Sequence, residues 1–218
     1  MRARSRIEYT VTSTQRLRND AAEIFMHTPR TVVFDIETSN WFSEVGGNDP
    51  AALSIALVGI HDSETGYASF LEHEFPQLWK ILEQTDVLVG WNSDHFDVPL
   101  LNKYYPGDLA RIRSLDLMHE IYESLGRRLK LDAVAEGTLG QKKTGHGGQS
   151  IKWWRDGEVE KVRDYCLKDV ELTKGIFDYA MEHGKIKYRE LGKTREIQLK
   201  TAHWLAATAK PMTFSMGF

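Results

Sequence analysis

The sequence has little that would tie it to an oxidising compartment or to a membrane. Its single cysteine, Cys166, cannot form a disulfide within the chain, so a reducing, cytoplasmic setting is the simplest expectation. No apolar run approaches the roughly 18 residues of a membrane helix. Arg2, Arg4 and Arg6 stand near the start, but no apolar segment follows them, which argues against a secretory signal. We therefore expect a cytoplasmic protein with no membrane partner.

The chain also lacks an overall positive charge, since its formal net charge is −3. The charge is unevenly distributed, with −12 over 31–126, +3 over 1–30, +4 over 127–163 and +2 over 164–218. An acidic half that can bind cations, beside a basic remainder that can bind phosphates, suits a metal-dependent protein acting on a polyanion. Ordinary surface solvation would produce the same asymmetry, so charge alone does not decide between the two.

Internal repeats and low-complexity segments are absent as well. The 218 residues, of which 41% are hydrophobic and 27% charged, fit one α/β domain with a small appendage. We expect a lead-in over 1–29, the domain over 30–184, and a C-terminal hairpin and tail over 185–218.

Apolar runs and helical spacing alternate in an order that predicts a mixed five-stranded sheet flanked by helices. Three β-branched, apolar runs separated by short turns indicate an antiparallel meander, and later strands alternate with helices. The glycine- and lysine-rich segment 140–150 is expected to be a loop, and Gly184 to end the longest helix. The expected strands are 31–36, 53–60, 67–71, 86–91 and 112–117, and the expected helices are 18–26, 75–84, 97–105, 118–125, 131–139 and 159–183.

Two acids stand near the end of the first expected strand. Asp35 and Glu37 are two residues apart, so both point to one face, ~6.5–7 Å apart along the strand. Two like charges ~4 Å apart repel by about 4 kcal/mol at an effective dielectric of 20, and a divalent ion reverses that sign. A solvated strand end, with Glu37 capping the next turn, is the alternative.

Two further motifs carry acids. Asp97 begins a helix just after a strand, where sites collect in parallel sheets, although it could simply cap that helix, and Asp94 competes for either role. Tyr165 and Asp169 lie one turn apart on the longest expected helix and share a face. A core aromatic and an exposed helix acid are the alternatives for that pair.

Together these motifs resemble the DEDDy group of 3′–5′ exonucleases, which includes the proofreading domains of family B DNA polymerases. They read VVFDIET at 32–38, VLVGWNSDHFDVPLL at 87–101 and YCLKDVELT at 165–173. The sister group carries a histidine five residues before the last aspartate, whereas this chain has Asp164 there and Tyr165 next to it. A bacterial exonuclease-like family associated with helicases is also similar.

This resemblance implies a ribonuclease-H-like α/β fold and a two-metal 3′–5′ exonuclease. The metal ligands would be Asp35, Glu37, Asp97 and Asp169, whose oxygens favour Mg²⁺ or Mn²⁺ over zinc. Tyr165, as a phenol with a pKa near ~10, is a poor base and better suited to donate a hydrogen bond to the attacking water or the phosphate. The partner would be the 3′ end of DNA or RNA, with a possible helicase or polymerase partner.

Other polar and aromatic residues are candidates for substrate binding. The backbone of Thr38 could meet the terminal nucleotide, and an aromatic residue could either stack on a base or simply pack. The basic residues of the 140–150 loop are expected to contact the substrate backbone. The candidates are Thr38, Trp41, Asn92, Phe96, Lys142 and Lys143, with Phe42, His95 and His146 less specific, Trp153 and Trp154 expected to cover the core, and Cys166 assigned no catalytic role.

Two rival functions remain open from the sequence. A non-catalytic nucleic-acid-binding module could keep the same fold, and a metal-dependent endonuclease could use the same acids. Cleavage products from end-labelled single strands would distinguish these possibilities.

Overall fold

The computed structural model describes residues 28–141 and 148–206. The expected helix over 18–26 and the candidates Lys142, Lys143 and His146 lie outside these residues. No helix within the described ranges is both long and apolar enough to cross a membrane.

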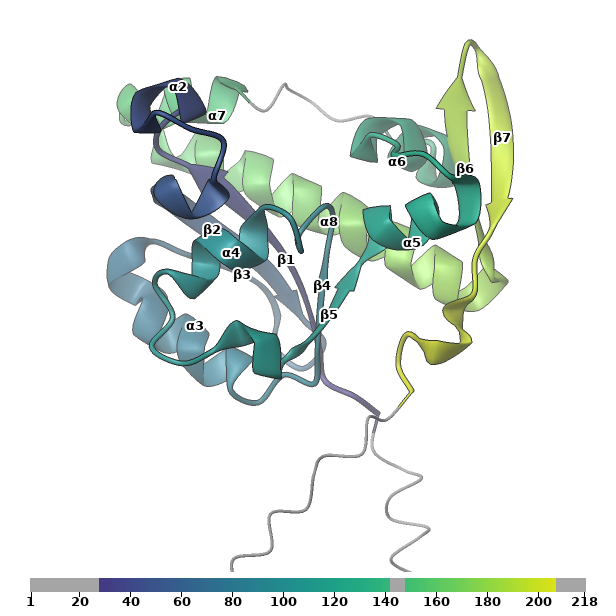
Figure 1. Cartoon of the computed structure of the whole chain (residues 1–218), viewed down its shortest axis with the longest axis horizontal. Coiled ribbons are helices and arrows are strands. Elements are labelled where there is room, and N and C mark those ends of the chain that lie inside the picture. The colour runs from purple at the N-terminus through teal and green to yellow at the C-terminus, as the bar shows by residue number, and fades with distance from the viewer. Residues whose placement is uncertain (1–27, 142–147, 207–218) are drawn as a thin grey trace, which may run out of the picture.

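A mixed five-stranded sheet forms the centre of the molecule, as the sequence predicts (Figure 1). Its strand order is β3-β2-β1-β4-β5. The first three strands form the antiparallel meander, whereas β4 and β5 run parallel to β1. The strands are β1 (Thr31–Thr38), β2 (Ile55–Asp62), β3 (Gly66–Phe70), β4 (Val87–Gly90) and β5 (Arg113–Asp116).

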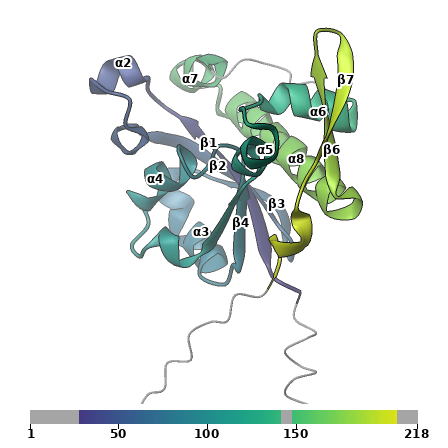
Figure 2. The ribbon, with the colours of Figure 1, turned by 45° about the vertical axis from the view of Figure 1, so that its right-hand side comes forward.

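Helices cover both faces of the sheet, with the long α8 crossing one of them (Figures 1 and 2). Two short helices were not predicted. The 140–150 segment is not a loop throughout, because α7 begins at Gly148, and Phe42 starts the one-turn helix α2. The helices are α2 (Phe42–Val45), α3 (Phe75–Leu82), α4 (Asp97–Asn102), α5 (Leu117–Leu125), α6 (Leu131–Leu139), α7 (Gly148–Arg155) and α8 (Val159–His183), with 3₁₀ turns η1 (Pro50–Ala52), η2 (Glu72–Glu74), η3 (Leu109–Arg111) and η4 (Thr201–His203).

Strand alternation divides the core into two layers. Val32, Phe34 and Ile36 point to one face of β1 and pack with apolar residues of α3 and α4. Val33 points to the other face, where it meets α5, α6 and α8. Successive strand residues alternate between faces, so Asp35 lies on the same face as Val33. The first acid of the sequence motif is thereby directed toward α8.

The C-terminal hairpin packs against this second layer. It consists of β6 (Lys185–Glu190) and β7 (Lys193–Gln198). Gly184, just before it, has a positive φ of 64° and ends α8, as predicted. A Cβ on Gly137 of α6 would lie 2.4 Å from the Tyr188 backbone, so α6 and β6 are in close contact. Trp204, fully buried after the hairpin, stacks on Phe177 of α8. The hairpin therefore helps to hold α6 beside α8.

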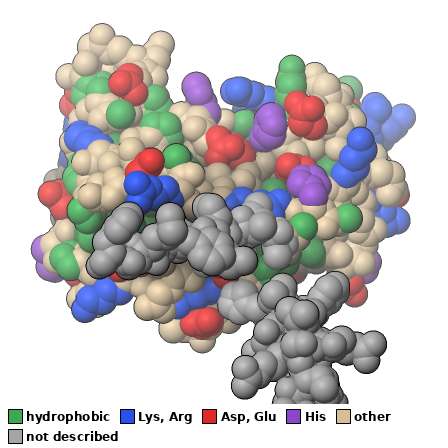
Figure 3. Space-filling view, turned by 60° about the horizontal axis from the view of Figure 1, so that its bottom comes forward, with side chains coloured by type: hydrophobic (Ala, Val, Ile, Leu, Met, Phe, Trp, Pro, Cys, Tyr) green, Lys and Arg blue, Asp and Glu red, His purple; other side chains and the backbone are tan. Residues whose placement is uncertain are grey.

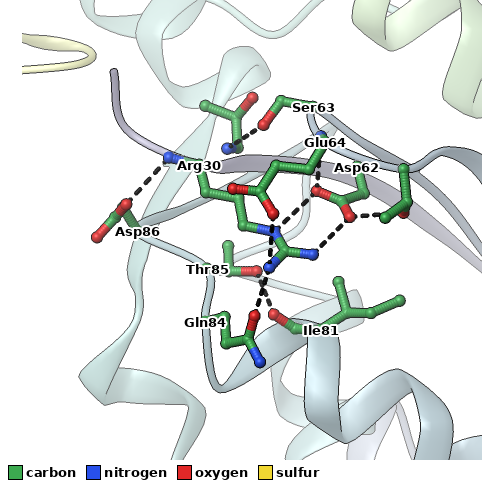
Figure 4. A network of polar contacts seen from close by, with 10 residues as sticks. Arg30, Asp62, Ser63, Glu64, Ile81, Gln84, Thr85 and Asp86 are labelled. Atoms are coloured by element: carbon green, nitrogen blue, oxygen red, sulfur yellow. Dashed lines mark hydrogen bonds and ion pairs between the residues drawn. The ribbon is translucent and has the colours of Figure 1, made fainter. Parts of the chain in front are cut away.

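A buried ion pair joins the residue before β1 to the last residue of β2 (Figure 4). It lies at the end of β1 that is far from Glu37. The Arg30 guanidinium donates to both carboxylate oxygens of Asp62, at 3.0 and 2.7 Å, and to Gln84 Oε1 at 2.7 Å. Burial by itself raises the pKa of Asp62, but hydrogen bonds from Arg30 and Thr65 outweigh it and lower the pKa to about 2. The pair is thus ionised and enclosed in the folded state.

We expect Asp62→Ala to lower the free energy of unfolding by about 3–5 kcal/mol, because it removes the buried partner of Arg30 and leaves only the exposed Glu64. Urea unfolding at neutral pH measures this loss. The pKa of Asp62 is depressed on folding, so its stabilisation is present above its unfolded pKa near ~4 and is lost as the pH falls toward about 2. The difference between variant and wild type should therefore shrink over that interval.

Glu64→Ala is the matched control for this prediction. Glu64 pairs with the same guanidinium at 3.0 Å but is 60% exposed, so its loss should cost less than ~1 kcal/mol. Equal effects of the two substitutions would show that burial of the Arg30–Asp62 pair is not what stabilises this end of the sheet.

Candidate active site

The close approach of α8 to β1 depends on a glycine in the neighbouring strand. Gly59 of β2 pairs with Asp35 in the antiparallel register. A Cβ at Gly59 would lie 2.8 Å from the Cys166 sulfur, so a larger residue would displace the Cys166 side chain or α8. The absent side chain lets α8 pack directly against the strand that carries Asp35.

Four carboxylates and a tyrosine from three separate elements line one pocket of about 220 Å³. β1 supplies Asp35 and Glu37, the start of α4 supplies Asp97, and α8 supplies Tyr165 and Asp169. All but Asp35 are buried, with Glu37 only 7% exposed. Glu37 is therefore not part of a solvated strand end, and Asp169 is not an exposed helix acid.

The pocket concentrates negative charge. Burial raises the pKa of Asp97 well above its usual range, and repulsion from Asp35, Glu37 and Asp116 raises it further. Such a set of buried like charges is costly unless a cation neutralises it. The donors from Asp35, Glu37, Asp97 and Asp169 are all oxygen, which suits Mg²⁺ or Mn²⁺. These residues thus fit divalent cations both by charge and by donor type.

Cys166 touches one of the proposed ligands. Its thiol donates to the Asp35 backbone oxygen at 3.3 Å and lies 3.5 Å from Asp35 Oδ2. Burial, and then the nearby charges of Asp35 and Glu37, raise the pKa of the thiol well above its usual range. The thiol is therefore a protonated donor that holds Asp35 in place. Its sulfur also lies close enough to Asp35 and Glu37 for the three residues to hold one ion. The sequence missed this contact.

Tyr165 is held by α7, the helix that the sequence did not predict. Its ring packs edge-to-face on Trp153, with centroids 5.9 Å apart, and is only 4% exposed. Trp153 and Trp154 also pack on the small cluster of Leu57, Val162 and Cys166, which confirms that they cover the core. The tyrosine is fixed in place one helical turn before Asp169.

The sequence matches the RNase H superfamily over residues 32–182. The chain belongs to the RNase H superfamily. None of the curated proteins matches the sequence. The structure is similar to that of the family B DNA polymerase from the hyperthermophilic archaeon Pyrobaculum calidifontis, with a TM-score of 0.54 and 22% identity over 70% of this chain and 24% of the polymerase. The chain thus spans about a quarter of that protein, and the likeness is one of fold.

In this RNase H superfamily domain, the loop after β4 is shaped by Asp116. Asn92 has a positive φ of 60°, which asparagine tolerates better than most residues. Its backbone N–H donates to Asp116 Oδ1 at 2.8 Å, and that of Asp94 to Oδ2 at 3.3 Å. Asp116 also caps α5 through the N–H groups of Met118 and His119. Asp116 was not among the predicted site residues, although an aspartate between a strand and a helix is a recognisable cap.

The candidate substrate residues fall into three groups. Thr38, Asn92 and Phe96 line the carboxylate pocket. Trp41 is 40% exposed and contacts Gly148 of α7, outside the lining of that pocket. Asp97 lies among the carboxylates and Asp94 does not. Asp94 accepts a hydrogen bond from the Ser114 hydroxyl and lines a neighbouring hollow together with His95. Lys142 and Lys143 lie outside the described residues, so their role stays a prediction.

Proposed function

We propose that this RNase H superfamily domain is a metal-dependent 3′–5′ exonuclease of the DEDDy type, acting on single-stranded nucleic acid. The convergence of Asp35, Glu37, Asp97 and Asp169 with Tyr165 in one pocket carries the proposal. The order and wording of the three motifs support it, and so does the fold shared with a DNA polymerase. A cytoplasmic location and a helicase or polymerase partner belong to the same proposal.

The four carboxylates would hold two Mg²⁺ or Mn²⁺ ions. Such ions lower the pKa of water and neutralise charge on the phosphate and on the leaving oxygen. The protein's contribution is to bring the carboxylates together and to bury them before substrate arrives. Glu37, Asp97 and Asp169 are each less than a tenth exposed, so bulk water screens their charge only weakly.

The remaining residues position the reacting groups. Tyr165 would donate a hydrogen bond from its phenol O–H to the attacking water or the scissile phosphate. Cys166 holds Asp35 by a hydrogen bond to its backbone. Thr38 and Phe96 line the same pocket and would meet the terminal nucleotide, Thr38 through its backbone and Phe96 by stacking on the base.

Single strands labelled at the 3′ or at the 5′ end provide the test. With Mg²⁺ present, the 5′-labelled strand should shorten one nucleotide at a time, and the 3′-labelled strand should release labelled mononucleotide at once. EDTA should stop both reactions. Internal cuts would identify an endonuclease instead, and an intact but bound strand would identify a non-catalytic binding module.

A further inference from the structure

The carboxylate pocket opens into a longer groove between the end of β4 and helices α5 and α6. The carboxylate pocket shares Asp35, Asn92 and Asp169 with a hollow of about 420 Å³ that is also lined by Arg128 and Lys130. That hollow shares Asn92 and Arg128 with a third one of about 390 Å³. We call the part lined by Met118, His119, Tyr122, Arg128 and Lys130 the α5–α6 arm.

The part of the pocket lined by Phe96 is packed against protein. Phe42 of α2 lies edge-to-face on Phe96, with ring centroids 6.1 Å apart. Beyond it, α2 and α7 lie side by side (Figure 1), joined by Trp41 against Gly148 and by an Arg155–Glu44 ion pair of 2.6 Å. A chain bound with its end among the carboxylates can therefore continue along the α5–α6 arm.

The cations of the arm make no ion pair among the described residues, unlike the adjacent Arg127. Acidic and basic side chains are intermixed on the face drawn in Figure 3. Several lysines and arginines of the protein are paired with acids, as along α8. Arg127 is bound to Glu190 at 2.5 Å. By contrast, Arg128 and Lys130 are exposed and make no ion pair with any residue that the structure describes. Their charges are thus available to a ligand.

Two of the acids that line these hollows, Asp116 and Asp94, already accept hydrogen bonds from the protein. Asp116 is already bonded by four backbone N–H groups, and Asp94 accepts the Ser114 hydroxyl. Asp132 lines the hollow next to the carboxylates, and its buried Oδ1 meets no donor among the described residues. Tyr122 is 45% exposed and lines the same hollow as Asn92 and His95. An available cation pair beside an exposed ring is the combination that binds unpaired strands.

We infer that the α5–α6 arm holds a single strand on the 5′ side of the scissile phosphate. Arg128 and Lys130 contact its phosphates, and Tyr122 stacks on one of its bases. Stacking requires an unpaired base, so the ligand is single-stranded rather than duplex. The inference rests on the proposed function and names the path by which its substrate reaches the carboxylates.

Binding of 5′-fluorescein-labelled oligothymidylates, measured by anisotropy with Ca²⁺ in place of Mg²⁺, tests the inference without cleavage. The double variant Arg128→Ala/Lys130→Ala should bind a long strand at least about tenfold more weakly. Its salt dependence should fall by roughly 1.4 in log–log slope, since each lost phosphate contact on a single strand removes about 0.7. Tyr122→Ala should weaken binding by on the order of tenfold with little change in slope.

Strand length makes the test specific to the arm. The wild type should gain affinity from a dinucleotide to a longer strand, and the double variant should lose most of that gain. Arg127→Ala is the matched control, because it removes the same charge from an adjacent residue that faces the hairpin. Its affinity, slope and length dependence should match those of the wild type.

Wild-type affinity and slope in the double variant would overturn the inference, and so would equal losses in Arg127→Ala. A wild type that fails to bind any oligothymidylate would also overturn it. If the wild type binds through the arm but does not cleave in Mg²⁺, the proposed exonuclease activity fails while the strand path stands.

Discussion

Asp169→Asn is expected to lower the rate of hydrolysis by about a thousandfold or more while leaving the protein folded. A metal ligand contributes to several kcal/mol of transition-state charge stabilisation, and each ~1.4 kcal/mol corresponds to a tenfold change in rate. Asparagine has nearly the shape of aspartate, so the packing of this buried position, 3% exposed, is kept. Rates on a 5′-labelled strand, with folding checked by circular dichroism, measure the effect.

Metal binding gives a second measurement for the same variant. Mn²⁺ should raise the melting temperature of the wild type, because a ligand of the folded state alone stabilises it. The variant should lose most of this rise. In EDTA its melting temperature should equal or exceed that of the wild type, since one buried like charge has been removed from beside the others.

Asp164→Asn is the matched control on the same helix. Asp164 lies on α8 but is exposed and lines a hollow away from the carboxylates. It should keep both the wild-type rate and the response to Mn²⁺. Near-wild-type turnover by folded Asp169→Asn would remove Asp169 from the proposed metal ligands.

Tyr165→Phe is expected to reduce the rate by ~10²–10³-fold without abolishing it. Removing one positioned donor from a reacting group commonly has an effect of this size. The phenylalanine ring keeps the edge-to-face contact with Trp153, and all four carboxylates remain. Substrate affinity and the Mn²⁺-induced rise in melting temperature should therefore match those of the wild type. Tyr179→Phe, which removes a hydroxyl farther along α8, should leave the rate unchanged.

The pH profile separates the possible roles of Tyr165. The wild-type rate should rise with pH, because the attacking water must lose a proton. If Tyr165 only donates a hydrogen bond, Tyr165→Phe should have a lower rate at every pH but a pH profile of the same shape. If Tyr165 acts as the base, the variant should lose the pH dependence of the rate. Full activity of Tyr165→Phe would make position 165 a packing residue and remove the feature that distinguishes the DEDDy group.

Much of the fold could be predicted from the sequence because its strongest signals are local. The apolar run of β1 and the alternation of strands and helices indicated the mixed sheet, and the strand spacing placed Asp35 and Glu37 on one face. The short helices α2 and α7 escaped prediction. The segment before α7 is rich in glycine and lysine, and α2 is a single turn, so neither has a long apolar period.

Only part of the candidate site could be predicted from the sequence. The motifs named the four carboxylates and Tyr165, and the structure places these five residues in one pocket. Contacts between distant residues could not be read from spacing. The thiol of Cys166 reaches Asp35 across 131 positions of sequence, and Asp116 shapes a loop 22 to 24 residues earlier. Both depend on how the sheet and α8 are packed.

The sequence by itself determined which charged residues stand at strand and helix ends and which of them share a face, because backbone periodicity sets the direction of each side chain. Only the tertiary structure decided which of those charges are concentrated and which are neutralised. Adjacent arginines show the difference: Arg127 is bound to Glu190 of the hairpin, whereas Arg128 lines the groove beside the carboxylates. Glu190, the partner of Arg127, comes from β6, and packing of the hairpin against α6 is what separates the two environments.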